Sequence, residues 1–394
     1  MKYLLLVGDG MADYPLKELG DKTVLEVART PNLDHLASCG EIGRVRTIPE
    51  EMDPGSDVAI LSILGYDPKI DYPGRAPLEA AARGISLKSD EVAFRLNLVT
   101  VHQYHLRDYS AGHIKTEVAK ELIEFLNDHL GDSHKRFYPG VSYRHLLVLK
   151  GDFGDVKCTP PHDIIGQEIK RYLPSGRGAS YLTSIMYTSY DLLKDHPINL
   201  KRRELQEEEA NMAWLWGQGK APTLSSLKDR FGLEGMVIAD VDLIKGIGVS
   251  IGLKVIEVKG ATGYLDTDYT AMAQAALDAL EEVDFVFFHV EAPDEAGHLG
   301  DIEAKKRAIE EFDEKVVGKV LKEVSRFGSH RILVLSDHPT PISLRTHTKD
   351  PVPFVLYDSC SPKDRNIAFN EMEAKRSPLF IEEGYRLIEY FLKE

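Results

Sequence analysis

The sequence predicts an α/β protein, with a mostly parallel sheet between helices and a smaller α/β domain inserted into it. Short apolar runs alternate with amphipathic helical stretches, a pattern typical of a parallel sheet that is covered on both faces. The character of the sequence changes near Asp90, and the alternation returns after about residue 205. Because 394 residues are too many for one simple core, we expect a core domain at 1–90 and 205–394 and an inserted domain at 91–204.

Five compact apolar runs are expected to form strands of the core sheet. Such runs, closed by glycine or aspartate, are typical of buried parallel strands. They are KYLLLVGDG at 2–10, GMVIADVDLI at 235–244, LKVIEV at 253–258, DFVFFHV at 284–290 and RILVLSD at 331–337.

Helical spacing of apolar residues marks the segments between these strands. In the core domain we expect helices at 30–40, at 56–65, at 269–282 and at 302–328. In the inserted domain we expect strands at 91–101 and 143–151, and helices at 116–131 and 179–196.

Composition excludes several classes of partner. The formal net charge is −15 and no basic domain offsets it, so we expect no nucleic-acid partner.

Three widely spaced cysteines, Cys39, Cys158 and Cys360, are expected to be reduced thiols. The N-terminus turns polar too soon for a signal peptide, and no apolar run is long enough to span a bilayer. We therefore expect a cytoplasmic protein that does not bind membranes, and the sequence leaves its oligomeric state open.

Aspartate and histidine side chains gather where the predicted strands end, and in open α/β sheets ligands bind beyond the carboxyl ends of strands. These residues are Asp9, Asp294, His298, Asp337, His338 and His347. An aspartate that closes a strand is more often a helix cap or a solvated turn residue. The coincidence of several such ends, two of them with histidine, carries the prediction of a metal site.

Carboxylate and imidazole ligands together suit manganese, zinc or cobalt better than calcium. The six side chains and one serine fit two adjacent divalent metal ions, with open positions for substrate oxygens as in two-metal phosphoryl transfer. Manganese is expected first, with zinc, cobalt or magnesium as alternatives. Asp294 and His298 are four residues apart and can share one helical face, although Pro293 and Gly297 suggest a looser turn.

Ser56 is the candidate nucleophile. In DPGSDVA the Pro54-Gly55 pair makes a turn, which places the serine at the N-cap or in the first turn of the next helix. Exposed amide groups and the positive end of the helix dipole favour a phosphate there. A serine at a helix start is more often only a cap, so the two roles remain open on this segment alone.

Nine segments spread over nearly the whole chain are highly specific when taken in order. They are GDGMADYP, TPNLDHLASCGEIG, PGSDVAILSILGYDP, GRAPLEAAARGI, VAFRLNLVTV, GATGYLDT, APDEAGH, SDHPTP and HTKDPVPF. Together they resemble the cofactor-independent phosphoglycerate mutases of the archaeal type, within the alkaline phosphatase superfamily.

The resemblance implies an alkaline-phosphatase-like core and an inserted domain that closes over the substrate. It implies a 2,3-bisphosphoglycerate-independent phosphoglycerate mutase of glycolysis, which passes the phosphoryl group of 3-phosphoglycerate through phosphoserine to give 2-phosphoglycerate. One metal would be held by Asp294, His298 and His347. The other would be held by Asp9, Asp337, His338 and Ser56.

Some residues depart from the archaeal pattern. His113 stands where an arginine is usual, and Ala76 stands in GRAP where GRGP is usual. Other segments are closer to a bacterial branch with a proposed homoserine kinase role. A homoserine kinase-like phosphotransferase of the same fold is therefore the alternative function. A catalytically silent metal-binding protein is a third hypothesis, against which the full ligand set and Ser56 argue.

Several charged residues are candidates for binding a small phosphorylated substrate, because arginine suits carboxylates and phosphates. They are Arg144, His145, Lys245, Arg75 and Asp108. For Arg144 and His145 the alternative is an edge-strand charge with a partly buried histidine. For Lys245, which is expected to follow a strand end, the alternative is a solvated lysine.

Overall fold

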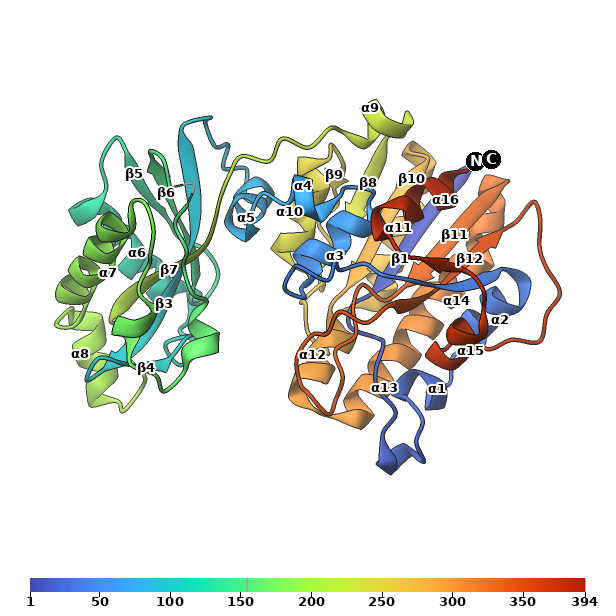
Figure 1. Ribbon diagram of the computed structural model, residues 1–394, viewed down its shortest axis with the longest axis horizontal. Coiled ribbons are helices and arrows are strands. Elements are labelled where there is room, and N and C mark those ends of the chain that lie inside the picture. Colours follow the sequence, from blue (N-terminus) through green and yellow to red (C-terminus); the bar gives the residue numbers. More distant parts are fainter. Residues whose placement is uncertain (154, 394) are drawn as a thin grey trace. The chain divides into compact units, whose positions relative to one another are not determined.

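The computed structural model describes residues 1–153 and 155–393. Backbone contacts divide the chain into two compact units, shown in Figure 1. The core unit comprises Met1–Tyr72 and Thr223–Glu394, and the inserted unit comprises Pro73–Pro222. Each unit contains its own sheet and helices, so the predicted α/β fold with a second, smaller α/β unit is confirmed.

The inserted unit is wider than the 91–204 expected from the sequence. Its first helix, α5 (Arg75–Ala82), buries small side chains against strand β3 (Glu91–His102). Its last strand, β7 (Met212–Lys220), pairs antiparallel with β3. The charged run at 201–210 begins within helix α8 (Pro197–Glu204) and lies inside this unit.

The core unit holds an eight-stranded sheet, in the order β13-β2-β12-β11-β1-β10-β8-β9. In chain order the strands are β1 (Lys2–Gly8), β2 (Glu41–Val45), β8 (Gly235–Ile238), β9 (Lys254–Val255), β10 (Phe285–Val290), β11 (His330–Leu335), β12 (Val352–Asp358) and β13 (Phe380–Ile381). The strands β11, β1, β10, β8 and β9 run parallel, whereas β12 is antiparallel to both β11 and β2. The prediction of a mostly parallel sheet is therefore confirmed.

Helices of the core unit cover both faces of this sheet (Figure 1). They are α1 (Val24–Val27), α2 (Pro31–Cys39), α3 (Ser56–Ile63), α4 (Pro68–Asp71), α9 (Leu227–Phe231), α10 (Asp242–Ser250), α11 (Tyr269–Glu282), α12 (Ala292–Leu299), α13 (Ile302–Glu311), α14 (Gly318–Glu323), α15 (Glu371–Arg376) and α16 (Leu387–Leu392), with 3-10 turns at Lys17–Leu19, Val324–Phe327 and Gly384–Arg386. Leu4 of β1 packs in the hydrophobic cluster that includes residues of α2, α11 and α13. The preceding residue, Tyr3, contacts the ring of Phe391 in α16 edge-on. Successive side chains thus serve opposite layers.

Three predicted core elements differ in the structure, and one of them, the run at 253–258, is strand β9 only at Lys254–Val255. The run at 235–244 is strand β8 only to Ile238, and its second half starts helix α10, where Gly248 packs directly on Val237. The expected helix at 302–328 is interrupted by a π-helix at Phe312–Val317. Asp313 of that segment accepts hydrogen bonds from the backbone N–H groups of Asn32 and Leu33, so a buried carboxylate caps the start of α2.

The inserted unit contains a five-stranded antiparallel sheet, in the order β4-β3-β6-β5 with β7 on the other side of β3. Its other elements are β4 (His105–Asp108), α6 (Thr116–Leu130), β5 (Lys135–Tyr138), β6 (Arg144–Lys150), 3-10 turns at Pro161–Ile164 and Ile169–Tyr172, and α7 (Ala179–Leu193). Strand β6 lies between β3 and β5, so the alternative of an edge-strand position for Arg144 and His145 does not hold. In the part of the chain that the structure describes, no helix is long and apolar enough to cross a membrane.

Candidate metal centre

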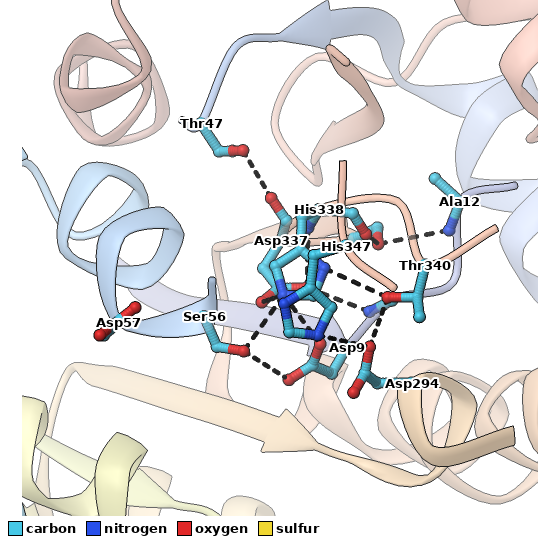
Figure 2. Close-up of polar contacts among 12 residues, drawn as sticks. Asp9, Ala12, Thr47, Ser56, Asp57, Asp294, Asp337, His338, Thr340 and His347 are labelled. Atoms are coloured by element: carbon cyan, nitrogen blue, oxygen red, sulfur yellow. Dashed lines mark hydrogen bonds and ion pairs between the residues drawn. The ribbon is translucent and has the colours of Figure 1, made fainter. Parts of the chain in front are cut away.

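Three neighbouring parallel strands bring the predicted ligands together. Asp9 directly follows β1, Asp337 follows β11 after one residue, and Asp294 lies in the first turn of α12, which begins two residues beyond β10. Because β11, β1 and β10 are adjacent and parallel, their carboxyl ends meet at one edge of the sheet. Figure 2 shows the side chains converging at this edge.

The first ligand set consists of Asp294, His298 and His347. The Nε2 atom of His298 lies 3.1 Å from Oδ2 of Asp294, and Nε2 of His347 lies 3.4 Å from Oδ1. The two imidazole Nε2 atoms are 2.9 Å apart. One ligand atom from each residue lies within 4.8 Å of the other two, so one ion could touch all three. Asp294 and His298 share a face of α12, so the looser turn suggested by Pro293 and Gly297 is not formed.

The second set joins Asp9, Asp337 and His338 to Ser56. The Oγ atom of Ser56 lies 3.3 Å from Oδ2 of Asp9 and 3.2 Å from Nε2 of His338. That nitrogen is also 3.2 Å from Oδ2 of Asp337. Asp9, Asp337 and His338 are completely buried. Oδ1 of Asp9 and Oδ2 of Asp337 are buried without a hydrogen-bond partner, which is costly unless a cation or proton satisfies them.

Burial and the nearness of other charged groups change the pKa values of several ligands of the centre. Burial, and then the negative charges of Asp337 and other carboxylates, raise the pKa of Asp9 well above its usual range. Burial likewise lowers the pKa of His338 to about 4, so this ring is neutral near pH 7 and its nitrogen can act as a ligand. Burial opposes ionisation of Asp294 as well, but hydrogen bonds from His298 and His347 outweigh it and hold the pKa of this carboxyl well below its usual value.

Ser56 is the first residue of α3, and the cap position before it is occupied by Gly55. Its hydroxyl makes no capping hydrogen bond to the helix backbone and instead faces Asp9 and His338 (Figure 2). The neighbouring Asp57 points away from the cluster and accepts a hydrogen bond of 2.6 Å from Tyr72. The interpretation of Ser56 as a mere cap is therefore not supported by its contacts.

Thr340 is a supporting residue that the sequence patterns did not single out. Its hydroxyl donates to Oδ1 of Asp294 and lies 3.3 Å from Nδ1 of His338, so it touches one member of each ligand set. The backbone oxygen of Thr340 accepts a 2.8 Å hydrogen bond from the fully buried Lys305. Gly10 packs against the same group, since a Cβ atom there would lie 2.6 Å from the Thr340 hydroxyl.

Three further acidic or imidazole side chains lie beside the centre and were not predicted either. His289 of β10 is completely buried, and its Nε2 atom lies 2.9 Å from Oδ2 of Asp9. Glu291 precedes α12, and Asp240 lies two residues beyond β8. The sequence could have identified two of these residues as candidate ligands, because His289 and Glu291 belong to the same FVFFHVEAPDEAGH segment as Asp294.

The proposed substrate-binding residues are distributed over both units. Lys245 lies in α10 rather than directly after a strand, and it forms a 2.6 Å ion pair with Glu257. His145 is 1% exposed, and its Nδ1 atom accepts a hydrogen bond from the backbone of Gly140. Asp108 accepts from both the N–H and the hydroxyl of Ser110. These contacts favour structural roles for the three residues.

Arg75 and Arg144 keep their place as candidate anion-binding residues of the inserted unit. Arg75 contacts Glu79 at 3.2 Å, and the same carboxylate meets the buried Arg95 at 3.1 Å. Burial works against the charge on Glu79, but Arg95 and Arg75 outweigh it and lower its pKa. Arg144, at the start of β6, is exposed. Arginines thus outnumber carboxylates in this group within a strongly acidic chain.

The fold and the centre define the class: an α/β protein that gathers aspartate, histidine and serine at the carboxyl edge of a parallel sheet. Comparison with known proteins makes this specific, and the chain belongs to the family of 2,3-bisphosphoglycerate-independent phosphoglycerate mutases. The model of that family matches residues 37–199. The phosphoglycerate mutase of Methanosarcina barkeri is 50% identical over 396 residues, covering 100% of both chains. A probable mutase of Geobacter sulfurreducens is also 50% identical, over 397 residues and 100% of both chains.

Solved structures agree with the fold. The PH0037 protein from Pyrococcus horikoshii superposes with a TM-score of 0.84 at 29% identity, covering 99% of this chain and 96% of that one. A cofactor-independent phosphoglycerate mutase from Thermoplasma acidophilum gives a TM-score of 0.66 at 26% identity, covering 100% and 99%. None of these relatives favours the homoserine kinase alternative.

Proposed function

We propose that the protein interconverts 3-phosphoglycerate and 2-phosphoglycerate through a phosphoserine at Ser56, in a site that holds two divalent metal ions. The observation that carries the proposal is the position of the Ser56 hydroxyl, which lies within 3.3 Å of both Asp9 and His338 inside the ligand cluster. The reaction class comes from the full-length relatives, which are named as phosphoglycerate mutases. Such an enzyme acts in glycolysis, in the cytoplasm, on a small phosphorylated substrate and without nucleic acid or membrane.

The residues present fit two metal ions. Asp294, His298 and His347 would hold one, and Asp9, Asp337, His338 and Ser56 would hold the other. The buried oxygens of Asp9 and Asp337 that lack hydrogen-bond partners support this assignment, because a cation would satisfy them. When bound, the ions would neutralise phosphoryl oxygens and favour the ionised serine. The mixed carboxylate and imidazole set suits manganese first, with zinc, cobalt and magnesium as alternatives.

Ser56 would act as the acceptor and then as the donor of the phosphoryl group. In the first half, the Ser56 hydroxyl loses its proton and a bond forms between Oγ and phosphorus, while the bond from phosphorus to the 3-oxygen breaks and the 3-oxygen gains a proton. In the second half, the 2-hydroxyl loses its proton and takes the phosphoryl group from Oγ, and Oγ regains a proton. No water is consumed. In the resting site, the Ser56 hydroxyl donates a 3.3 Å hydrogen bond to Oδ2 of Asp9, and its oxygen lies 3.2 Å from Nε2 of His338.

Substrate recognition is proposed for the inserted unit, residues 73–222. Arg75 and Arg144 present guanidinium groups that suit the carboxylate and phosphate of a phosphoglycerate. Glu79 holds Arg75 through an ion pair of 3.2 Å, and the same carboxylate holds Arg95, which stacks on Trp216. We propose this unit as the substrate-capping domain, because a phosphoserine must be shielded from water if the group is to return to glycerate.

The test offers manganese-loaded full-length protein 3-phosphoglycerate in one tube and homoserine with ATP in another. The expected product is 2-phosphoglycerate, formed without added 2,3-bisphosphoglycerate and followed by phosphorus NMR. Mass spectrometry of the quenched protein should find phosphate on the peptide that contains Ser56. Formation of O-phosphohomoserine without 2-phosphoglycerate would replace the mutase with the kinase alternative.

A matched pair of variants isolates the serine. Ser56→Ala should abolish turnover while the bound metal and the circular dichroism spectrum remain close to those of the parent. Ser226→Ala is the control, because Ser226 caps α9 by accepting a hydrogen bond from the backbone of Asp229. It should lose a little stability and keep its activity. Near-normal turnover in Ser56→Ala would rule out the covalent route.

A further inference from the structure

A third group of possible metal ligands lies next to the proposed centre. Asp240 follows β8, His289 is in β10, and Glu291 directly follows β10. Since β8 and β10 are hydrogen-bonded parallel neighbours, their ends bring these side chains together. One ligand atom from each lies within 4.8 Å of the other two. The proposed two-metal mechanism uses none of the three.

The hydrogen bond of His289 leaves one ring nitrogen with a lone pair. Its Nε2 atom lies 2.9 Å from Oδ2 of Asp9. If Asp9 is an ionised metal ligand, as the proposed function has it, that oxygen can only accept, so Nε2 carries the proton. In the neutral ring, Nδ1 then has the free lone pair. Nδ1 is buried and has no hydrogen-bond partner, and His289 is 0% exposed.

This arrangement is the one that metal-binding histidines adopt. A histidine that holds a metal through one nitrogen usually donates its other N–H to a carboxylate or carbonyl, which fixes the tautomer. Asp9 supplies that carboxylate for His289. The unpartnered Nδ1 is thus in the state required of a ligand.

Asp240 shows the same division between a satisfied and an unsatisfied atom. Its Oδ2 atom accepts a 3.4 Å hydrogen bond from Thr267, while Oδ1 is buried without a hydrogen-bond partner. A carboxylate oxygen of Asp240 and one of Glu291 therefore lie within 4.8 Å of each other and of a ring nitrogen of His289, and none of the three side chains carries a fixed positive charge. Asp240 and Glu291 are partly buried and His289 is 0% exposed, so charge at this position is poorly stabilised by solvent.

We propose that Asp240, His289 and Glu291 hold a third divalent cation, separate from the two ions of the catalytic centre. Two carboxylates and one imidazole suit manganese or magnesium, with zinc also acceptable. The ion would fix the tautomer of His289, which in turn holds Oδ2 of Asp9 and leaves Oδ1 for the catalytic metal. It thereby acts on the orientation of a ligand and touches no substrate. The competing explanation is a proton shared by the two carboxylates.

The test counts ions in the full-length protein. Metal-free protein is dialysed against manganese and analysed for bound metal, and manganese-loaded crystals are examined by anomalous diffraction. The expected result is three ions per chain, with one anomalous peak between Asp240, His289 and Glu291. Asp240→Asn should lose that peak and one ion. Asp242→Asn, which changes an exposed carboxylate at the start of α10, should keep all three.

Failure of this site is distinguishable from failure of the catalytic centre. Asp294→Asn should remove an ion from the centre and leave the peak at Asp240. If Asp240→Asn does not fold, as judged by circular dichroism, Glu291→Gln takes its place. No peak at this position in the parent protein, with two ions bound, would favour the shared proton and overturn the proposal. Retention of the third ion in Asp240→Asn would also overturn it.

Discussion

Replacing the buried lysine of the core unit should weaken both the fold and the metal centre. The Nζ atom of Lys305 donates to Oδ2 of Asp13 at 2.8 Å, to the backbone oxygen of Thr340 at 2.8 Å and to that of Ala12 at 3.3 Å. Both charged side chains are 0% exposed. Lys305→Met keeps an unbranched side chain shorter by one heavy atom and removes all three hydrogen bonds, leaving the Asp13 carboxylate without its cation.

The size of the effect follows from the burial. Removing one partner of a fully buried ion pair costs about 3–5 kcal/mol of unfolding free energy, because the other charge is left uncompensated. Thr340 also loses an anchor, and its hydroxyl is the group that holds Asp294. Loss of such an indirect support lowers metal affinity by about 10–100-fold. Manganese affinity at the set that contains Asp294 should therefore fall together with stability.

Urea denaturation of the metal-free protein measures the first effect, and calorimetric titration with manganese measures the second. Lys319→Met is the control, because the pair of Lys319 with Glu323 is partly exposed and is expected to contribute less than about 1 kcal/mol. Thr340→Val removes only the hydroxyl, and it should reduce manganese affinity while leaving the Lys305 ion pair in place. An unchanged denaturation midpoint and unchanged affinity in Lys305→Met would refute the reasoning.

Three further predictions concern strain, protons and charge. Gly10→Ala should weaken manganese binding more than Gly20→Ala, because both residues have a positive φ but only Gly10 has atoms within 4 Å of the added Cβ. Equal losses of manganese affinity in the two variants would mean that backbone strain alone causes the loss. In the metal-free protein burial opposes the charge on His298, but its hydrogen bond to a carboxylate outweighs this and raises its pKa from 6.5 to about 9. Protonation of His298 therefore stabilises the metal-free fold fully below pH 6.5, and this stabilisation is lost as the pH rises through about 9. Because the metal must displace that proton, manganese affinity should rise across the same pH window. Calorimetry in two buffers at pH 7.5 should detect the released proton, and a binding enthalpy that does not depend on the buffer would contradict the prediction. Arg75→Met should raise KM about 10–100-fold, the equivalent of one charge-assisted hydrogen bond, with metal content unchanged, whereas Arg171→Met, an exposed residue of the same unit, should leave KM unchanged.

The parts of the fold that the sequence predicted are those with a local signal. The strands β1, β10 and β11 are compact apolar runs that are followed directly by polar residues, and burial on both faces requires such runs. Metal-ligand candidates could be found for the same reason, because parallel strands place their carboxyl ends at one edge. Ser56 could be placed at a helix start from Pro54 and Gly55 alone.

What the sequence did not show depends on contacts between distant segments. Strand β2 pairs with β12 across more than three hundred residues, and no local pattern in either segment specifies its partner. The boundary at residue 73 falls in the Pro/Gly-rich stretch at 71–77, a candidate boundary in the sequence, but the pairing of β7 with β3 that extends the inserted unit to residue 222 has no local signal. His289 was predicted only as part of a strand, and the structure alone shows its ring nitrogen beside Asp9.

The register of the central strands is what turns separate ligands into one site. Gly8 of β1 pairs with Val290 of β10, and Val7 pairs with Leu335 of β11, so the three strands end level. The backbone N–H of Asp9 continues the ladder by donating to the oxygen of Val290 at 3.0 Å. A slip of one residue in β1 would turn Asp9 to the opposite face of the sheet, because successive side chains alternate. The carboxylate would then leave Ser56, His338 and His289 at once, so the proposed nucleophile and the proposed third cation site depend on the same strand pairing.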